Sequence, residues 1–213
     1  MKTRSENGTS ISANALAKRY NREWIFRKLT FDFHPGKIYA ITGPNGSGKS
    51  TLLQVLCGVT PPSTGSLKYN DGDSLAPVEE IYHRVAIATP YLDLIEEFTL
   101  EEHVKFHFKL RPARNKMSIK EAIDRMSLTS SASKQIGNFS SGMRQRVRLG
   151  LALFTDADLV FLDEPGTNLD KTSFKWYESE LAKLPSHCVT FIASNDPAEY
   201  TSAHHTLNIL DFK

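Results

Sequence analysis

Residues 43–51 read Gly-Pro-Asn-Gly-Ser-Gly-Lys-Ser-Thr and match a phosphate-binding loop, in which a glycine, four free positions, Gly-Lys and a hydroxyl residue follow in order. Such glycines let the backbone aim successive N–H groups at a phosphate chain, and a following helix adds the positive end of its dipole. An ordinary turn would have no need of Lys-Ser-Thr at its end. We therefore predict a nucleotide site formed by Gly43, Pro44, Asn45, Gly46, Ser47, Gly48, Lys49, Ser50 and Thr51.

Two of these side chains have a distinct chemical task. Lys49 supplies a point charge for the β- and γ-phosphates, and the Ser50 hydroxyl is placed to ligate a magnesium ion that bridges them. Residues 159–164 read Leu-Val-Phe-Leu-Asp-Glu, which predicts a buried strand that delivers Asp163 to the same metal. Glu164, just past the strand, is positioned to accept a proton from an attacking water. The alternative is a core strand followed by an acidic turn.

A third segment, residues 139–146, reads Phe-Ser-Ser-Gly-Met-Arg-Gln-Arg. Ser140, Ser141 and Gly142 open an amphipathic helix, where exposed N–H groups and hydroxyls could bind an anion. Taken alone, Ser-Ser-Gly is also ordinary chemistry for a helix start. Three alternating arginines follow in the same predicted helix, Arg144, Arg146 and Arg148, and are expected to form a solvated face.

The sites require strands and helices in a particular order. Polar and apolar residues alternate loosely through residues 11–33, which predicts antiparallel sheet, whereas the apolar runs downstream suit parallel strands buried on both faces. Capping boxes begin at Thr99 and Ser118, and Asp170 and Asp196 are helix N-caps. The expected strands are 24–26, 29–33, 37–42, 66–69, 85–88, 159–162 and 189–193. The expected helices are 50–57 and those that follow these four caps. The helix after Asp170 should end before Pro185 and direct four apolar side chains toward the core: Phe174, Tyr177, Leu181 and Leu184.

Composition limits the function classes. The chain has 213 residues and a formal net charge of +2. It contains no dense basic run interleaved with aromatic residues, so we do not expect it to bind nucleic acid. Cys57 and Cys188 sit in apolar runs, which indicates buried free thiols in a reducing compartment. We find no signal-peptide pattern and no apolar run long enough for a membrane span, so a cytoplasmic protein is expected. Residues 1–10 are polar and are expected to be frayed.

Together, the motifs resemble the ATP-binding subunit of ABC transporters. Residues 43–51 look like its Walker A motif, 159–164 its Walker B motif, 139–143 its signature sequence, and 166–170 the loop after Walker B at the dimer seam. The resemblance implies an α/β fold, with a mainly parallel, RecA-like P-loop NTPase core, an N-terminal antiparallel β subdomain and an inserted helical subdomain. The whole chain would be one ATP-binding domain, its core at about 11–97 and 156–213 and its helical subdomain at about 98–155.

The resemblance also implies a mechanism. Two such subunits, identical or related, would sandwich two ATP molecules between the phosphate loop of one and the signature of the other. Closure of this ATP sandwich would drive conformational change in integral membrane permease subunits. The chain would bind these permease subunits as a peripheral protein at the cytoplasmic face of the membrane. Tyr20 would stack on adenine, although Trp24 or Phe26 could serve instead. Residues 91–98 would be part of the surface that receives the permease.

Several positions depart from the family pattern. Pro90 stands where a glutamine usually senses the metal, and Asn195 replaces the histidine that contacts the γ-phosphate. Ser141 and Met143 replace a glycine and a glutamine of the signature, and Gly166 replaces a small hydroxyl residue. The favoured function is therefore a Mg²⁺-dependent ATPase subunit of a transporter of the short export type, in which these departures favour ATP binding over fast hydrolysis. The alternative is an ATP-gated dimerisation module with little or no hydrolysis; a transport-independent ATPase acting on ribosomes or DNA is disfavoured because tandem units and long coiled-coil insertions are missing.

Overall fold

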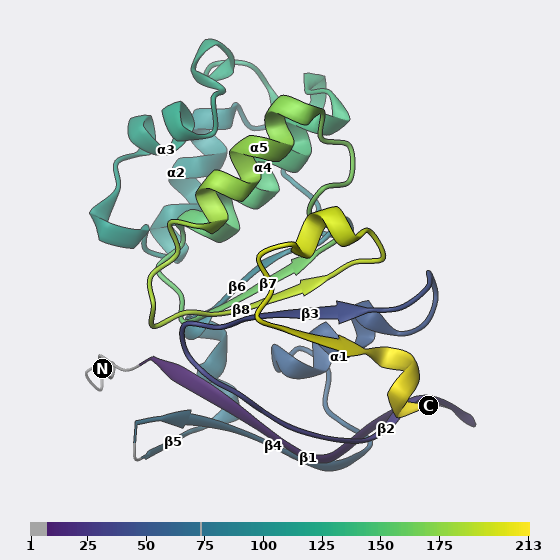
Figure 1. Ribbon diagram of the computed structural model, residues 1–213. Helices are drawn as coiled ribbons and strands as arrows, with labels where there is room; N and C mark the ends of the chain where they lie inside the picture. The colour runs from purple at the N-terminus through teal and green to yellow at the C-terminus, as the bar shows by residue number, and fades with distance from the viewer. Residues whose placement is uncertain (1–7, 73) are drawn as a thin grey trace. The chain divides into compact units, whose positions relative to one another are not determined.

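A computed structural model describes residues 8–72 and 74–213 (Figure 1). The strands and α-helices are β1 (Thr9–Tyr20), β2 (Glu23–Phe33), β3 (Ile38–Thr42), α1 (Lys49–Leu56), β4 (Thr64–Asp71), β5 (Ser74–Ala76), β6 (Val85–Ala88), α2 (Leu100–Leu110), α3 (Ile119–Arg125), α4 (Ser141–Phe154), β7 (Leu159–Asp163), α5 (Lys171–Leu181), β8 (Val189–Ala193) and β9 (His205–Asn208). Short 3-10 helices include Val78–Arg84 and Pro197–Tyr200.

The chain divides into two compact units. The first comprises Met1–Val85, Asp158–Glu164 and Pro185–Lys213, and the second comprises Ala86–Ala157 and Pro165–Leu184. The functional division expected from the sequence, with a helical subdomain at about 98–155, stays a prediction.

A parallel sheet forms the centre of the first unit. Strands β7, β8, β3 and β9 lie side by side in that order, and each adjacent pair is parallel. Every residue of β7 and β8 is buried, as the uninterrupted apolar runs predict for parallel strands covered on both faces. Phe161 of β7 and Phe191 of β8 stack with ring centroids 4.6 Å apart, so aromatic packing supports the backbone pairing.

An antiparallel sheet of order β2-β1-β4-β5 covers this core from below in Figure 1, with α1 between the two sheets. Helix α1 packs on β7 and β8. Phe33 of β2 reaches the parallel sheet, where its ring lies 4.9 Å from those of Tyr39 and Phe191. The fold class expected from the sequence is thereby confirmed.

Helices α2 to α5 form the second unit, in which α2 packs on α3, α3 on α4, and α4 on α5. Thr99 and Glu102 make the expected capping box at the start of α2. At the start of α3, Ser118 accepts a hydrogen bond from the Glu121 N–H. Among the described residues, no helix is long and apolar enough to cross a membrane.

Some expected elements have different bounds. The strands at 24–26 and 29–33 are one continuous strand, β2, and residues 9–10, expected to be frayed, begin β1; residues 1–7 lie outside the described part. Helix α5 ends at Leu181, so Leu184 lies beyond it, and the helix after Asp196 is a single 3-10 turn. Strands β5 and β9 were not predicted, because three or four residues of mixed polarity carry no readable period.

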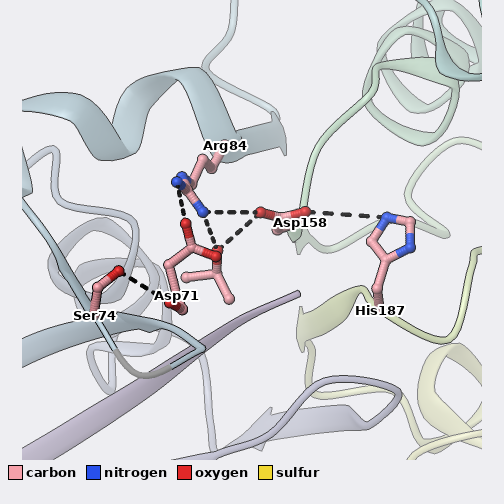
Figure 2. Close-up of polar contacts among 6 residues, drawn as sticks. Asp71, Ser74, Arg84, Asp158 and His187 are labelled. Atoms are coloured by element: carbon pink, nitrogen blue, oxygen red, sulfur yellow. Dashed lines mark hydrogen bonds and ion pairs between the residues drawn. The ribbon is translucent and has the colours of Figure 1, made fainter. Parts of the chain in front are cut away.

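A buried polar cluster joins the two sheets of the first unit (Figure 2). Asp158, which is 0% exposed, precedes β7 and accepts a hydrogen bond of 2.8 Å from Thr9 of β1. Arg84 lies 3.6 Å from Asp158 and 2.7 Å from Asp71 of β4. His187, before β8, approaches Asp158 at 4.0 Å. The Arg84 guanidinium therefore balances two carboxylates, Asp71 in β4 of the antiparallel sheet and Asp158 next to β7 of the parallel sheet.

Replacing Arg84 tests this cluster. Removal of one partner leaves a buried charge poorly compensated, so Arg84→Met should lower the free energy of unfolding by about 3–5 kcal/mol. Arg27→Met, at an exposed position of β2, is the control and should change it by no more than about 0.5 kcal/mol. Urea denaturation measures both. Equal, small losses in the two variants would show that the cluster does not stabilise the fold.

Candidate functional site

The carboxyl ends of three strands meet at one edge of the parallel sheet. Ala193 of β8 pairs with Ile41 of β3 on one side and with Asp163 of β7 on the other. The chain continues this alignment, because the Ser194 N–H donates to the Ile41 carbonyl at 3.1 Å and the Glu164 N–H to the Ala193 carbonyl at 2.8 Å. The loops that follow the three strands therefore emerge together, where ligands bind in open α/β sheets.

The phosphate loop follows β3 at this edge. Gly48 has a φ of +108° and a Cβ there would lie 2.3 Å from Ile25 Cγ2, so only glycine fits. The Lys49 side chain is buried, and its Nζ donates to the Gly43 and Pro44 carbonyls at 2.9 and 3.2 Å. Ser47 Oγ is buried and has no hydrogen-bond partner among the described residues. The loop carbonyls thus fix the position of the Lys49 ammonium group. Ser47 Oγ is left as a buried polar atom that a ligand could hydrogen-bond.

Helix α1 begins directly after this loop. Within the described part of the chain no side chain caps its N-terminus, and its first turn contains no acidic residue. The first N–H groups of a helix lack intrahelical partners and carry a partial positive charge. The arrangement suits a bound phosphate chain.

The residues present fit a magnesium ion at Asp163. This carboxylate is 3% exposed, and its Oδ1 has no hydrogen-bond partner within residues 8–72 and 74–213. Burial raises the pKa of Asp163, whereas the hydrogen bond from Ser50 opposes the shift. In those residues no group of three or more His, Cys, Asp or Glu could hold a metal by itself. A hydroxyl and one carboxylate suit Mg²⁺, which takes its remaining ligands from phosphates and water.

Glu164 has an unusual backbone conformation. Its φ is +47°, in the left-handed region that non-glycine residues seldom adopt, and Pro165 follows it in the sequence. The bond from its N–H to Ala193 fixes this turn at the end of β7. The side chain is half-buried beside the metal-site carboxylate, and the charge of Glu164 helps to raise the pKa of Asp163.

Asn195 lies in the short loop between β8 and the 3-10 helix Pro197–Tyr200. Its Nδ2 donates to Asn45 Oδ1 of the phosphate loop at 3.1 Å. The structure therefore brings Asn195 to the phosphate loop, where its amide can donate a hydrogen bond.

The three aromatic candidates for adenine stacking differ in exposure. Phe26 is 0% exposed in the core, and Trp24 is half-buried with the Arg19 guanidinium 5.4 Å from its ring centroid. Tyr20 is 47% exposed. Since Ile25 of the same hairpin touches Gly48, the hairpin lies against the phosphate loop with Tyr20 at its end.

The signature residues belong to the second unit. Ser140 is the N-cap of α4 and accepts a hydrogen bond from the Met143 N–H at 3.3 Å, while Ser141 is exposed. A Cβ at Gly142 would lie 2.8 Å from the Asn168 carbonyl oxygen, so glycine allows the 166–170 loop to approach the helix. Two serine hydroxyls and the start of α4 remain a candidate anion site.

The arginines of α4 do not form the solvated face that we expected. Arg144 makes an ion pair of 2.7 Å with Glu96, Arg146 contacts the Ser173 hydroxyl, and Arg148 donates to the Leu92 carbonyl at 2.9 Å. Alternating charges gave no sign of these partners, which lie far away in sequence. Gln145 was likewise missed: it is buried, and its Nε2 donates to the Pro165 carbonyl at 3.0 Å.

The two remaining departures lie in loops of the second unit. Pro90 follows β6 and is half-buried, and its ring carries no polar side-chain atom for a metal or phosphate. Gly166 accepts a hydrogen bond from the Leu169 N–H at 3.0 Å, which closes the turn after Walker B.

The chain is similar to known proteins in sequence and in fold. The ABC transporter family model matches residues 26–167. The lipoprotein-releasing system ATP-binding protein LolD of Leptospira interrogans is 29% identical, over 95% of this chain and 90% of its own length. The uncharacterized ABC transporter ATP-binding protein YcbN of Bacillus subtilis is also 29% identical, over 78% of this chain. A putative ABC transporter ATP-binding protein from Pyrococcus furiosus, of known structure, superposes with a TM-score of 0.82 at 21% identity, covering 96% of this chain and 99% of its own.

These matches differ in how much of the relative they include. The chain spans about half the length of YcbN, 54%, whereas it spans most of LolD. The family model covers well over half of this chain, from the β2 strand to the loop after Walker B. The chain therefore belongs to the ABC transporter family and corresponds to its ATP-binding subunit.

Proposed function

We propose that this chain binds ATP with Mg²⁺ and hydrolyses it to power transport through separate membrane subunits. The observation that carries the proposal is the meeting of the phosphate loop, Asp163 and Glu164 at one edge of the parallel sheet. In the same proposal the ATP-binding domain spans residues 1–213, with a core at about 11–97 and 156–213 and a helical subdomain at about 98–155.

Each residue of the site has a role in this proposal. The loop amides and Lys49 bind and orient the phosphates, and Tyr20 stacks on the adenine. Ser50 and Asp163 hold Mg²⁺, which when bound neutralises phosphate charge. Glu164 accepts a proton from the attacking water, and the Asn195 amide donates to a γ-phosphate oxygen. Lys49 already forms hydrogen bonds inside the loop. Its ammonium group is therefore positioned at the phosphate-binding loop before the nucleotide binds.

The partners follow from the family. Ser140, Ser141 and Gly142 would contact the nucleotide of a second ATP-binding subunit, either another copy or a related chain. Integral membrane permease subunits would bind residues 91–98, in which Tyr91 is 81% exposed. The subunit would therefore act at the cytoplasmic face of the cell membrane. The name of LolD, a lipoprotein-releasing system protein, supports a role in transport without identifying the substrate.

A second candidate is an ATP-gated dimerisation module with slow or no hydrolysis. Two observations favour it. Pro90 offers no side-chain ligand, and Asn195 carries no charge and cannot relay a proton at neutral pH. In this case ATP would close the dimer without rapid reopening.

Glu164→Gln tests the hydrolytic function. Loss of the general base should lower the steady-state turnover of MgATP by about 10²–10⁴-fold, because glutamine cannot accept the proton of water. The Kd of MgATP should stay within about twofold, since the amide preserves the shape of the side chain. Glu79→Gln, at an exposed carboxylate of the same unit, is the control and should leave turnover unchanged. Unaltered hydrolysis in Glu164→Gln would refute the assignment of the base.

Asn195→His tests the weakened γ-phosphate contact. An imidazole can donate a hydrogen bond and carry charge, so turnover should rise by about tenfold, whereas Asn195→Ala should lower it. The measurement is the kcat for MgATP at fixed pH. If Asn195→His and Asn195→Ala both turn over at the wild-type rate, Asn195 makes no contact that matters in the transition state.

Co-purification tests the transport partner. The affinity-tagged chain, captured from solubilised membranes, should recover a polytopic membrane protein in stoichiometric amount. Tyr91→Ala should weaken this recovery, because it truncates an 81% exposed aromatic side chain in the proposed docking segment. Tyr82→Ala, 59% exposed and in the first unit, serves as the matched control. Recovery of soluble proteins alone would favour the dimerisation module.

A further inference from the structure

The β1 strand is irregular where it approaches the nucleotide site. Its pairing with β2 shifts register between Leu16 and Lys18 and again between Lys18 and Arg19. Leu16, Ala17 and Lys18 are all buried, although side chains of a regular strand alternate between its two faces. A bulge rotates the strand locally and can redirect a side chain. Here it turns a lysine toward the protein interior.

The buried lysine has two neighbours. Lys18 is 9% exposed, and its Nζ donates to the Pro61 carbonyl at 2.8 Å. The same Nζ lies 5.0 Å from the centroid of the Tyr20 ring, within the range of a cation–π interaction. Burying a lysine costs rotamer freedom and hydration, which this carbonyl and this ring offset.

The Tyr20 ring is thereby contacted by Lys18 on one face, while much of the Tyr20 side chain is exposed to solvent. Its side chain is 47% exposed at the end of the hairpin, although an ammonium group lies over the ring. The register shift between Lys18 and Arg19 breaks the regular alternation of side chains, and the Lys18 ammonium lies 5.0 Å from the centroid of the Tyr20 ring. The hairpin contacts the phosphate loop through Ile25 and Gly48. The oriented ring therefore belongs to the surroundings of the nucleotide site.

A purely structural role for Lys18 would be to tie β1 to the loop after α1. That connection has other bonds: the Ser63 N–H donates to the Ala17 carbonyl at 2.8 Å, and the Arg19 N–H donates to Ser63 Oγ at 3.1 Å. The loop is therefore anchored on both sides of Lys18 without its ammonium group. These two hydrogen bonds do not involve Tyr20, so the contact between the Lys18 ammonium and the Tyr20 ring is the part of the arrangement that only Lys18 supplies.

We propose that Lys18 is a positioning residue for the nucleobase, whose ammonium group holds one face of the Tyr20 ring and leaves the opposite face for adenine. The inference rests on the proposed ATP site and adds a residue to it. Fixing the ring before the ligand arrives lowers the entropy cost of stacking. Lys18 should thus contribute to binding of the base and leave binding of the phosphates unaffected.

The experiment compares a ligand with a base to one without. Calorimetry gives the Kd of ATP and of inorganic tripolyphosphate, both with Mg²⁺, for the full chain and its variants. Lys18→Gln keeps a donor for the Pro61 carbonyl but removes the charge. It should weaken ATP binding by about three- to tenfold and change tripolyphosphate binding by less than about twofold. Lys18→Arg, which keeps a cation, should restore most of the ATP affinity.

Two further variants separate this role from general effects. Lys68→Gln, at an exposed position of β4, should bind both ligands as the wild type does. In a Tyr20→Leu background, Lys18→Gln should cause no additional loss of ATP affinity, because the ring that it positions is gone. This comparison remains informative if Lys18→Gln alone lowers the melting temperature.

The contrary outcomes are distinct. Equal weakening of ATP and tripolyphosphate in Lys18→Gln would show a structural role and overturn the inference, as would unchanged ATP affinity. If the wild-type chain binds tripolyphosphate as tightly as ATP, the inference of a base-binding site is overturned and the phosphate-binding site is retained. A wild-type chain that binds neither ligand would overturn the proposed function itself.

Discussion

The shared register of β3, β8 and β7 is the constraint on which the site depends. Ala193 pairs with both Ile41 and Asp163, so the residues after all three strands emerge at one edge. Stacked rings of Phe161 and Phe191 and the fully buried strands make a shift of this register costly. A slip of one residue in β7 would carry Asp163 away from Ser50 and turn apolar side chains to the opposite face.

The site contains polar groups that a stable core would avoid. Asp163 is buried with a raised pKa and an unsatisfied Oδ1, Ser47 Oγ is unpartnered within the described residues, and Glu164 has a left-handed backbone. Each of these costs folding free energy in the absence of a ligand. A bound phosphate chain with Mg²⁺ would supply the missing partners, so ligand binding and stability are coupled. In the Arg84 cluster, by contrast, charged partners lie within the protein: Arg84 pairs with both Asp71 and Asp158.

Local signals in the sequence predicted much of the fold and of the first half of the site. Gly-Lys-Ser after an apolar strand, and Asp-Glu after another, require few long-range contacts to be recognised, and the Thr99 capping box formed as expected. Contacts between distant segments could not be predicted. Gln145 reaches Pro165, Asn195 reaches Asn45, and Arg148 reaches Leu92 only because the fold brings them together. Lys18 is buried by a bulge, which has no signature in an alternating sequence.

ATP-dependent dimerisation tests the central claim most directly. Light scattering of purified Glu164→Gln gives the molar mass with Mg²⁺ alone and with Mg²⁺ and ATP. Our account predicts a monomer without ATP and a stable dimer with it, because in the proposed function the signature of each copy would complete the site of the other and the variant would not hydrolyse the nucleotide. Lys49→Ala in the same background should abolish the change. A chain that binds ATP and stays monomeric would contradict the sandwich of two identical subunits and require a different partner.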